Sequence, residues 1–119
     1  MAFRKLLQRL TTSDAELDRE RLQQFCRDVP GVTPIGEAEP RQEITVAGEI
    51  SSLRIVPRSG TPSLEVTVKD GSGSLVIVWT GRHHIPGVAP GRRLVVSGRG
   101  TAHGSNGRLT LLNPRYELL

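Results

Sequence analysis

Apolar residues recur at helical spacing at the start of the chain and alternate with polar residues in most of its remaining length. One helix face is outlined by Phe3, Leu6, Leu7 and Leu10. After two threonines, the run that begins at Ser13 has the form of a capping box, which predicts the start of a second helix. We therefore expect an N-terminal extension of two helices over residues 1–30.

The segment after this extension changes in composition. Residues 31–42 hold Gly31, Pro34, Gly36 and Pro40, and this density of glycine and proline is typical of irregular backbone. We expect a linker here, with a separate domain over residues 43–119.

Alternating apolar residues predict the first strands of that domain. A strand begins near Ile44, and the inward parity changes between Ile50 and Leu53, which predicts a bulge between Gly48 and Ser52. Bends of this kind allow a sheet to close into a barrel. A second strand has alternating residues over 64–68, and an Asp/Gly turn at 70–73 leads to an apolar third strand over 75–79.

The remaining strands come without a long helix between them. Residues 81–91 include two prolines and several glycines, which disfavours a long helix there. We expect a fourth strand over 92–101, a hairpin loop at 104–107, a fifth strand over 109–112 and a closing edge at 113–119. The predicted fold is mainly β: a five-stranded OB-fold barrel preceded by an N-terminal helical extension.

The charge is concentrated in the predicted barrel. The 119 residues carry 16 Lys and Arg against 12 Asp and Glu, but residues 50–119 alone hold nine basic and three acidic groups, a net charge of +6. A basic surface of this kind favours a partner that carries phosphate. Aromatic residues make up 3% of the chain, which limits any binding mode built on stacked bases.

The cysteine count and the hydropathy predict the cellular compartment of the protein. A single cysteine, Cys26, excludes an intramolecular disulfide and a cysteine-based zinc site, and it fits the reducing cytoplasm. Charged residues interrupt the apolar positions of residues 1–10, so this segment does not resemble a signal peptide. No stretch approaches membrane-spanning length, and we expect a cytoplasmic protein without a membrane partner.

Several short motifs of the predicted barrel resemble a known family when they are taken in order. They are Val46-Ala47-Gly48, Val68-Lys69-Asp70-Gly71-Ser72-Gly73, Trp79, Pro90-Gly91-Arg92, Val96-Ser97-Gly98 and Asn113-Pro114-Arg115-Tyr116-Glu117. The stretch from about Ile44 to Leu119 is similar to the OB-fold wedge domain of RecG-type branched-DNA helicases and to small stand-alone bacterial OB-fold proteins that bind nucleic acid.

That resemblance implies a binding module without a motor. The chain has no Gly-x-x-x-x-Gly-Lys-Ser/Thr phosphate loop, so no ATP-driven activity is expected. Wedge domains often have paired aromatic residues at the end of the third strand, whereas here Thr80 follows Trp79.

Candidate binding residues come from the face that OB barrels commonly use, along the second and third strands and the loops that flank them. Arginine side chains match phosphate groups with two parallel hydrogen bonds. The candidates for nucleic-acid binding are Arg54, Arg58, Lys69, Trp79, Arg82, Arg99, His103 and Arg108. Asn106 in the last hairpin loop is placed to bracket a strand of nucleic acid, while Glu65 repels phosphate unless it is paired.

Two of these assignments have alternatives. Trp79 shares its parity with Leu75 and Ile77, so it is either a platform for a base or a residue of the core. The basic groups either line one groove or lie scattered over a solvated surface.

Little in the sequence supports catalysis or a metal site. His83 and His84 are adjacent, so on a strand they point to opposite faces, and no carboxylate or thiolate completes a tetrahedral set. No serine-nucleophile motif or pair of catalytic acids is present. The letters of residues 104–107 match a Gly-x-x-Gly loop, but the setting is a hairpin turn.

We therefore expect a non-catalytic protein without a cofactor that binds single-stranded or branched DNA with little sequence specificity, and DNA is favoured over RNA. The alternative is an adaptor for protein–protein interaction, in which the helices bind a protein partner or a second copy of the chain. The sequence does not decide whether the helices pack on their own barrel or pair between chains.

Overall fold

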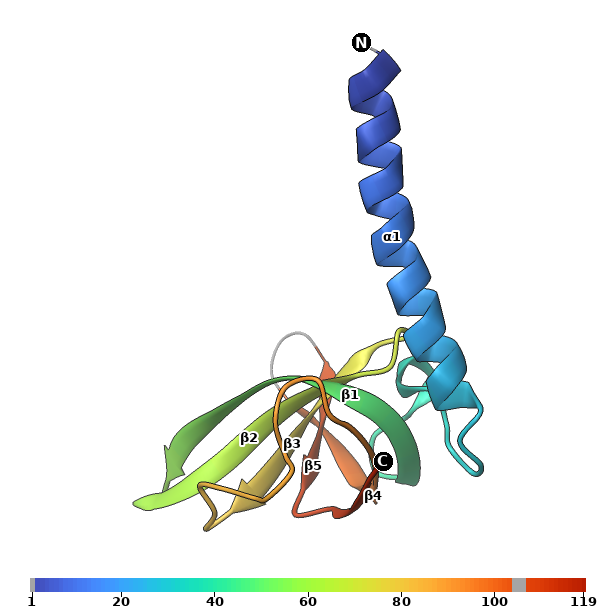
Figure 1. Ribbon diagram of the computed structural model, residues 1–119. Coiled ribbons are helices and arrows are strands. Elements are labelled where there is room, and N and C mark those ends of the chain that lie inside the picture. The colour runs from blue at the N-terminus through green and yellow to red at the C-terminus, as the bar shows by residue number, and fades with distance from the viewer. Residues whose placement is uncertain (1, 104–106) are drawn as a thin grey trace.

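The computed structural model describes residues 2–103 and 107–119, and for residues 2–13 and 103 it describes the backbone alone. A long helix precedes a curved sheet, and a short 3-10 helix, η1, lies between them (Figure 1). The elements are α1 (Ala2–Arg27), η1 (Ile35–Glu37), β1 (Glu43–Arg58), β2 (Thr61–Lys69), β3 (Ser74–Thr80), β4 (Arg93–His103), β5 (Arg108–Leu112) and β6 (Arg115–Leu118).

The strands close into a barrel. In the described part of the chain they follow the order β1-β2-β3-β5-β4-β6, and β1 also pairs with β4, so five strands form a ring. β6 pairs with the first half of β4, on the side that β5 leaves open. The predicted five-stranded OB-fold barrel is confirmed, and the closing segment at 113–119 adds a sixth strand to it.

β1 can serve two neighbours because it bends. Its first half pairs with β4 and its register with β2 shifts between Ile50 and Ser52, where the sequence predicted a bulge. Gly48 lies just before this shift, and a Cβ there would come within 2.3 Å of Val68 Cγ1, so the close approach of β1 and β2 requires glycine.

The interior of the barrel is filled by the strand residues of one parity. Val46, Val66, Leu75, Ile77 and Leu94 are among the residues of one contiguous core cluster. As predicted for residues 81–91, no long helix lies between β3 and β4, and this loop instead adds Ile85 and Val88 to the core.

The N-terminal extension is one helix, so the prediction of two helices is wrong. The backbone is helical without interruption from Ala2 to Arg27, and the capping-box sequence at Ser13 lies inside it. Ser and Thr have only slightly unfavourable helix propensity, and the good helix formers on both sides continue the helix through them. Pro30 and Gly31 follow the helix end, and Gly31 has the positive φ of 79° that favours glycine.

The segment predicted as an irregular linker is ordered by contacts with the barrel. It contains η1, and Ile35 lies in the barrel core. The Ile35 amide donates a hydrogen bond of 2.9 Å to the buried carboxylate of Asp70. The division into domains at 1–30, 31–42 and 43–119 stays a prediction.

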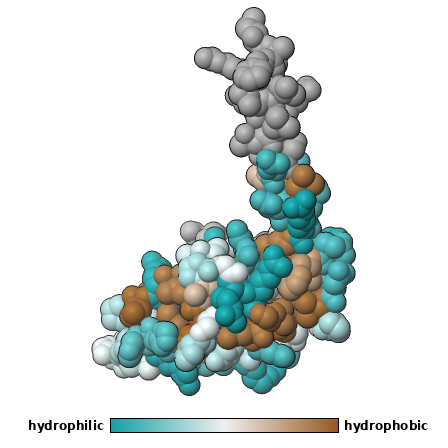
Figure 2. Space-filling model, in the orientation of Figure 1, coloured by the Kyte–Doolittle hydropathy of each residue, from teal (hydrophilic) through white to brown (hydrophobic). Residues whose placement is uncertain are grey.

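Only the C-terminal turns of α1 contact the barrel. Leu22 and Cys26 form a small second core with Ala47 of β1, which lies on the outer surface of the barrel. The rest of the helix projects away from the sheet, and the described part of its surface is mostly hydrophilic (Figures 1 and 2). Within the described residues, no helix is long and apolar enough to cross a membrane.

Candidate nucleic-acid interface

The strand register defines an outer face on β1, β2, β3 and β5. Residues whose parity is opposite to the core form rows across these strands, because directly paired residues lie side by side. One row consists of Arg54, Glu65, Val78 and Leu112, and the next consists of Ser52, Thr67, Val76 and Thr110. We refer to these two rows, with the row of Val56, Ser63 and Thr80 beside them, as the outer face.

Uncharged side chains make up most of the middle of the outer face, and some of them are buried. Val78 and Ser63 lie on it, yet each is only 1% exposed, and neither belongs to the core cluster of the barrel interior. The Ser63 hydroxyl is buried without a hydrogen-bond partner among the described residues. Threonine, serine and valine therefore form most of the outer face between its two ends, together with Glu65.

Glu65 does not leave an unpaired negative charge on this surface. Its Oε1 accepts hydrogen bonds from Arg54 Nη2 at 2.8 Å and from Arg54 Nε at 3.1 Å. The Arg54 side chain remains 71% exposed, so the pair is weakly coupled and Arg54 is still accessible to another anion.

Basic residues gather at the end of the outer face formed by the β1–β2 hairpin. Arg58 is the last residue of β1, and Arg82 follows β3; both are exposed. The Gly81 amide donates a 2.9 Å hydrogen bond to the Pro62 carbonyl, which holds the two loops together. The structure thus brings Arg54, Arg58 and Arg82 to one end of the outer face.

Lys69 and Arg108 lie at the opposite end. Lys69 pairs with Ser74 at the start of β3, and Arg108 lines a depression with Ser74 at the start of β5. Lys69 also borders an open cleft of about 740 Å³ between the barrel and α1, together with Arg19, Asp18 and Arg93.

Two further candidates lie on β4. Arg99 is exposed and has the outward parity of Thr101, which pairs with Thr110. His103 ends the strand, and only its backbone is described; Asn106 lies outside the described residues. Among the described side chains, the predicted cations therefore lie at the two ends of the outer face and on β4, with uncharged residues and Glu65 between them.

Trp79 is a core residue, so its assignment as a base-stacking platform is corrected. It is 5% exposed and packs in the core cluster of the barrel, because its parity matches that of Leu75 and Ile77. Its ring contacts the edge of Tyr116 at a centroid distance of 5.2 Å. Phe25, on α1, is 38% exposed with the Arg93 guanidinium 4.3 Å from its ring centroid.

The apolar contribution to this face was not predicted from the sequence. Leu112 is 58% exposed on β5 beside Val78. One sequence signal does assign Leu112 to the outer face. It alternates along β5 with the core residues Leu109 and Leu111, as do Arg108 and Thr110.

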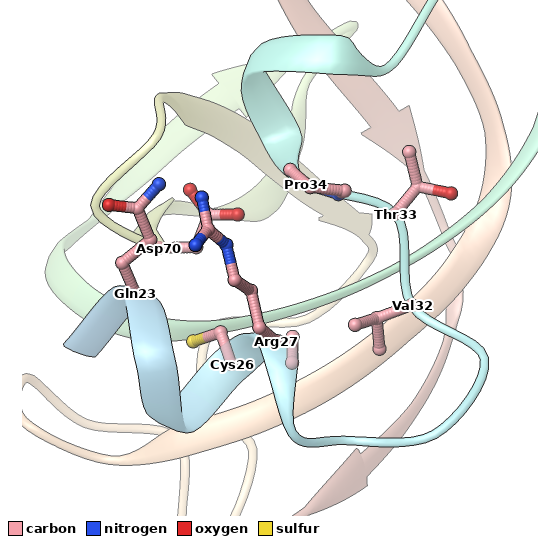
Figure 3. Close-up of a pocket in the computed structure, with 8 residues that line it drawn as sticks. Gln23, Cys26, Arg27, Val32, Thr33, Pro34 and Asp70 are labelled. Carbon is pink, nitrogen blue, oxygen red and sulfur yellow. The ribbon is translucent and has the colours of Figure 1, made fainter. Parts of the chain in front are cut away.

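The pocket beside the last turns of α1 does not provide a second functional site. The last turns of α1, residues 32–34 and Asp70 surround a pocket of about 70 Å³ (Figure 3), which has room for only a few atoms. Burial, with a smaller effect from the charge of Asp70, raises the pKa of the Cys26 thiol in this pocket to about 11. No group of three or more His, Cys, Asp or Glu side chains among the described residues could hold a metal ion.

Comparison with known proteins agrees with the fold. A family model described as an OB-fold nucleic acid binding domain matches residues 44–119. Compared by sequence with curated proteins, the chain has no significant match.

Solved structures with a similar fold include domains of larger proteins. A structure of RecG bound to a three-way DNA junction matches with a TM-score of 0.60 and 16% identity, over 74% of this chain and 12% of that chain. The second OB-fold domain of replication protein A from Methanococcus maripaludis matches with a TM-score of 0.53 and 21% identity, over 73% and 93% of the two chains. A chain of a replication protein A heterotrimer bound to ssDNA matches with a TM-score of 0.50 and 14% identity, over 71% and 62%.

Proposed function

Because the chain belongs to the family of OB-fold nucleic-acid-binding domains, we propose that it binds single-stranded or branched DNA across the outer face of β1, β2, β3 and β5. DNA is favoured over RNA, since the similar structures include RecG on a DNA junction and replication protein A on ssDNA. The function is recognition without catalysis and without a cofactor, in the cytoplasm.

The observation that carries this proposal is the distribution of charge on the outer face. Arg54, Arg58 and Arg82 lie at one end, Lys69 and Arg108 lie at the other, and mostly uncharged residues lie between them, where Glu65 is paired with Arg54. Cations at both ends bind backbone phosphates, and Val76, Thr110 and Leu112 between them contact sugars and bases.

This mode of binding has little sequence specificity. Phosphate contacts carry no sequence information, and the described outer face has no aromatic ring on which a base would stack. Affinity comes mainly from the release of counterions when arginine and lysine neutralise phosphates, so it falls as salt rises.

Fluorescence anisotropy with a labelled oligonucleotide of about 16 nucleotides, the upper range of site sizes for one OB fold, tests the proposal. We expect log Kd to rise linearly with log salt, with a slope of about 0.7 per phosphate contact on single strands. The double variant Arg58→Ala and Arg82→Ala should weaken binding about 10-fold and lower the slope by about 1.4, which is twice the value for one phosphate contact.

The matched control is Arg27→Ala with Arg92→Ala, which removes two exposed arginines that lie away from the outer face. This control should change affinity less than about twofold. Equal losses in the two double variants would mean that net charge alone attracts the oligonucleotide. Undetectable binding at low salt would overturn the proposal, and parallel titrations with duplex, forked DNA and RNA identify the preferred form.

A second candidate function is an adaptor for protein–protein interaction. The observation that favours it is the projection of α1 from the barrel, with Leu17 44% exposed and Phe25 38% exposed (Figure 1). Exposed apolar residues on an element with few contacts of its own are typical of interaction sites.

A further inference from the structure

The described side chains in the outward part of α1 are not buried by the barrel. Leu22 and Cys26 contact the barrel, whereas residues 14–21 are all exposed and the helix continues for several more turns away from the sheet (Figure 1). An isolated helix has marginal stability in water, because most helical stability in proteins comes from packing an apolar stripe against another element. A partner for this stripe would stabilise the helix.

The helix carries a stripe at the spacing of a coiled coil. Alternating steps of four and three residues connect Phe3, Leu7, Leu10, Asp14, Leu17 and Arg21. At about 100° per residue, the centre of this stripe lies about 120° around the helix from Leu22 and Cys26. The stripe is therefore distinct from the positions that contact the barrel, and Leu17 is its exposed apolar member among the described side chains.

The charges on the stripe disfavour a parallel pair of such helices. In register, a parallel pair would place Asp14 opposite Asp14 and Arg21 opposite Arg21 of the second copy. Like charges at facing positions destabilise a coiled coil, and a parallel pair would bury both the two Asp14 side chains and the two Arg21 side chains between the helices.

An antiparallel arrangement removes both like-charge contacts. With Leu7 opposite Leu17 of the second copy, the position of Phe3 lies opposite Arg21 and the position of Leu10 lies opposite Asp14. At the flanking positions that set orientation in coiled coils, Arg4 then faces Asp18 of the second copy, twice in each dimer.

We propose that α1 is a dimerisation element, through which two copies of this chain pair antiparallel along the stripe from Phe3 to Arg21. Charge complementarity between the basic N-terminal turns and the acidic middle of the helix selects a second copy as the partner. The barrel lies at the C-terminal end of α1 (Figure 1), so antiparallel pairing places the two barrels at opposite ends of the helix pair.

Sedimentation equilibrium over a range of protein concentrations tests the proposal. The mass should rise from 13.0 kDa toward twice that value as concentration increases. Leu17→Glu should abolish the increase, because it places a carboxylate in the seam at a position that is exposed in the monomer. Glu16→Lys, an exposed position about 140° from the centre of the stripe, is the control and should dimerise like the wild type.

The orientation is tested by exchanging charges. Arg4→Glu and Asp18→Arg should each abolish self-association, because each places like charges opposite one another. A 1:1 mixture of the two variants should form a heterodimer with two attractive pairs. Within one helix these positions are about 21 Å apart, so neither an intrahelical pair nor a parallel dimer would produce this recovery.

Asp14→Leu should strengthen the dimer, because it replaces the polar residue that interrupts the stripe. A wild-type mass that stays at the monomer value, or a mixture that fails to associate while the wild type dimerises, would overturn the antiparallel dimer. Circular dichroism and oligonucleotide binding of each variant report on folding and on the proposed nucleic-acid function separately, so the failure of either proposal is recognised by itself.

Discussion

Asp70 connects three segments through one buried carboxylate. Its Oδ1 accepts hydrogen bonds from the Ser72 amide at 2.9 Å, the Ser72 hydroxyl at 2.6 Å and the Gly73 amide at 3.1 Å. Its Oδ2 accepts the Ile35 amide, which lies 35 residues earlier in the chain. The carboxylate thus closes the β2–β3 turn and attaches η1 to the barrel.

Replacing Asp70 should therefore be costly. Asp70→Ala leaves several amide donors without an acceptor, and we expect it to lower the free energy of unfolding by about 3 kcal/mol. Urea unfolding measures the loss, and Asp28→Ala, which removes an exposed carboxylate bonded to Gln24, is the control. Similar losses for both variants would mean that the Asp70 contacts are not important for stability.

At the scale of elements, the attachment of α1 depends on a short contact. Leu22 and Cys26 pack on Ala47, and the helix also abuts the β2–β3 turn, where a Cβ on Gly71 would come within 2.8 Å of the Arg19 carbonyl oxygen. Gly71 has a φ of 88°, so both its conformation and the close approach require glycine.

The state of Cys26 reports on this contact. Because burial raises the pKa of its thiol to about 11 from an ordinary value of 9.0, the native protein holds about 100-fold less thiolate at pH 8 than an unfolded chain. We expect a thiol reagent such as DTNB to modify the native protein at least about 100-fold more slowly than the protein unfolded in guanidinium chloride. Equal rates would show that α1 is not docked in solution.

The same pKa shift fixes the sign of a pH effect on stability. A folded-state pKa above the unfolded value favours the protonated folded form, so the contribution is fully present below about pH 9 and is lost as pH rises toward 11. The difference in stability between the wild type and Cys26→Ala should therefore decrease over that interval, as measured by urea unfolding.

The sequence predicts the strands better than the helix and the linker. Strand parity follows directly from residues such as Leu64, Val66 and Val68, because one face of each strand is buried. The capping-box pattern at Ser13 was misleading, since local hydrogen-bonding patterns compete with helix continuation and lose when both flanks favour helix. Ile35 joined the core through a contact with Asp70 that no local pattern contains.

At the scale of the whole molecule, the barrel could be predicted and the geometry of the candidate interface could not. Counting arginines identified a basic domain, but it could not distinguish a continuous groove from two groups of cations separated by mostly uncharged residues. That distinction depends on which residues of different strands are neighbours, as with Val78 and Leu112. The burial of Trp79 likewise depends on the parity that the closed barrel turns inward.

The separation between helix and barrel leads to a prediction for the whole chain. The core cluster of the barrel contains no residue of α1, so deletion of residues 1–30 should leave a barrel that unfolds cooperatively on heating. Because the outer face lies on the barrel, oligonucleotide affinity should stay within about threefold of the full chain, although self-association should be lost.

The deletion also separates the two candidate functions. If protein partners captured by the full chain are lost while oligonucleotide binding persists, α1 is the assembly element and the barrel is the nucleic-acid module. A folded fragment that no longer binds the oligonucleotide would instead make the cleft between α1 and Lys69 part of the binding surface, since helix and barrel residues both line that open cleft. A fragment that fails to fold would contradict the independence of the barrel core, and with it the division of labour between the helix and the outer face.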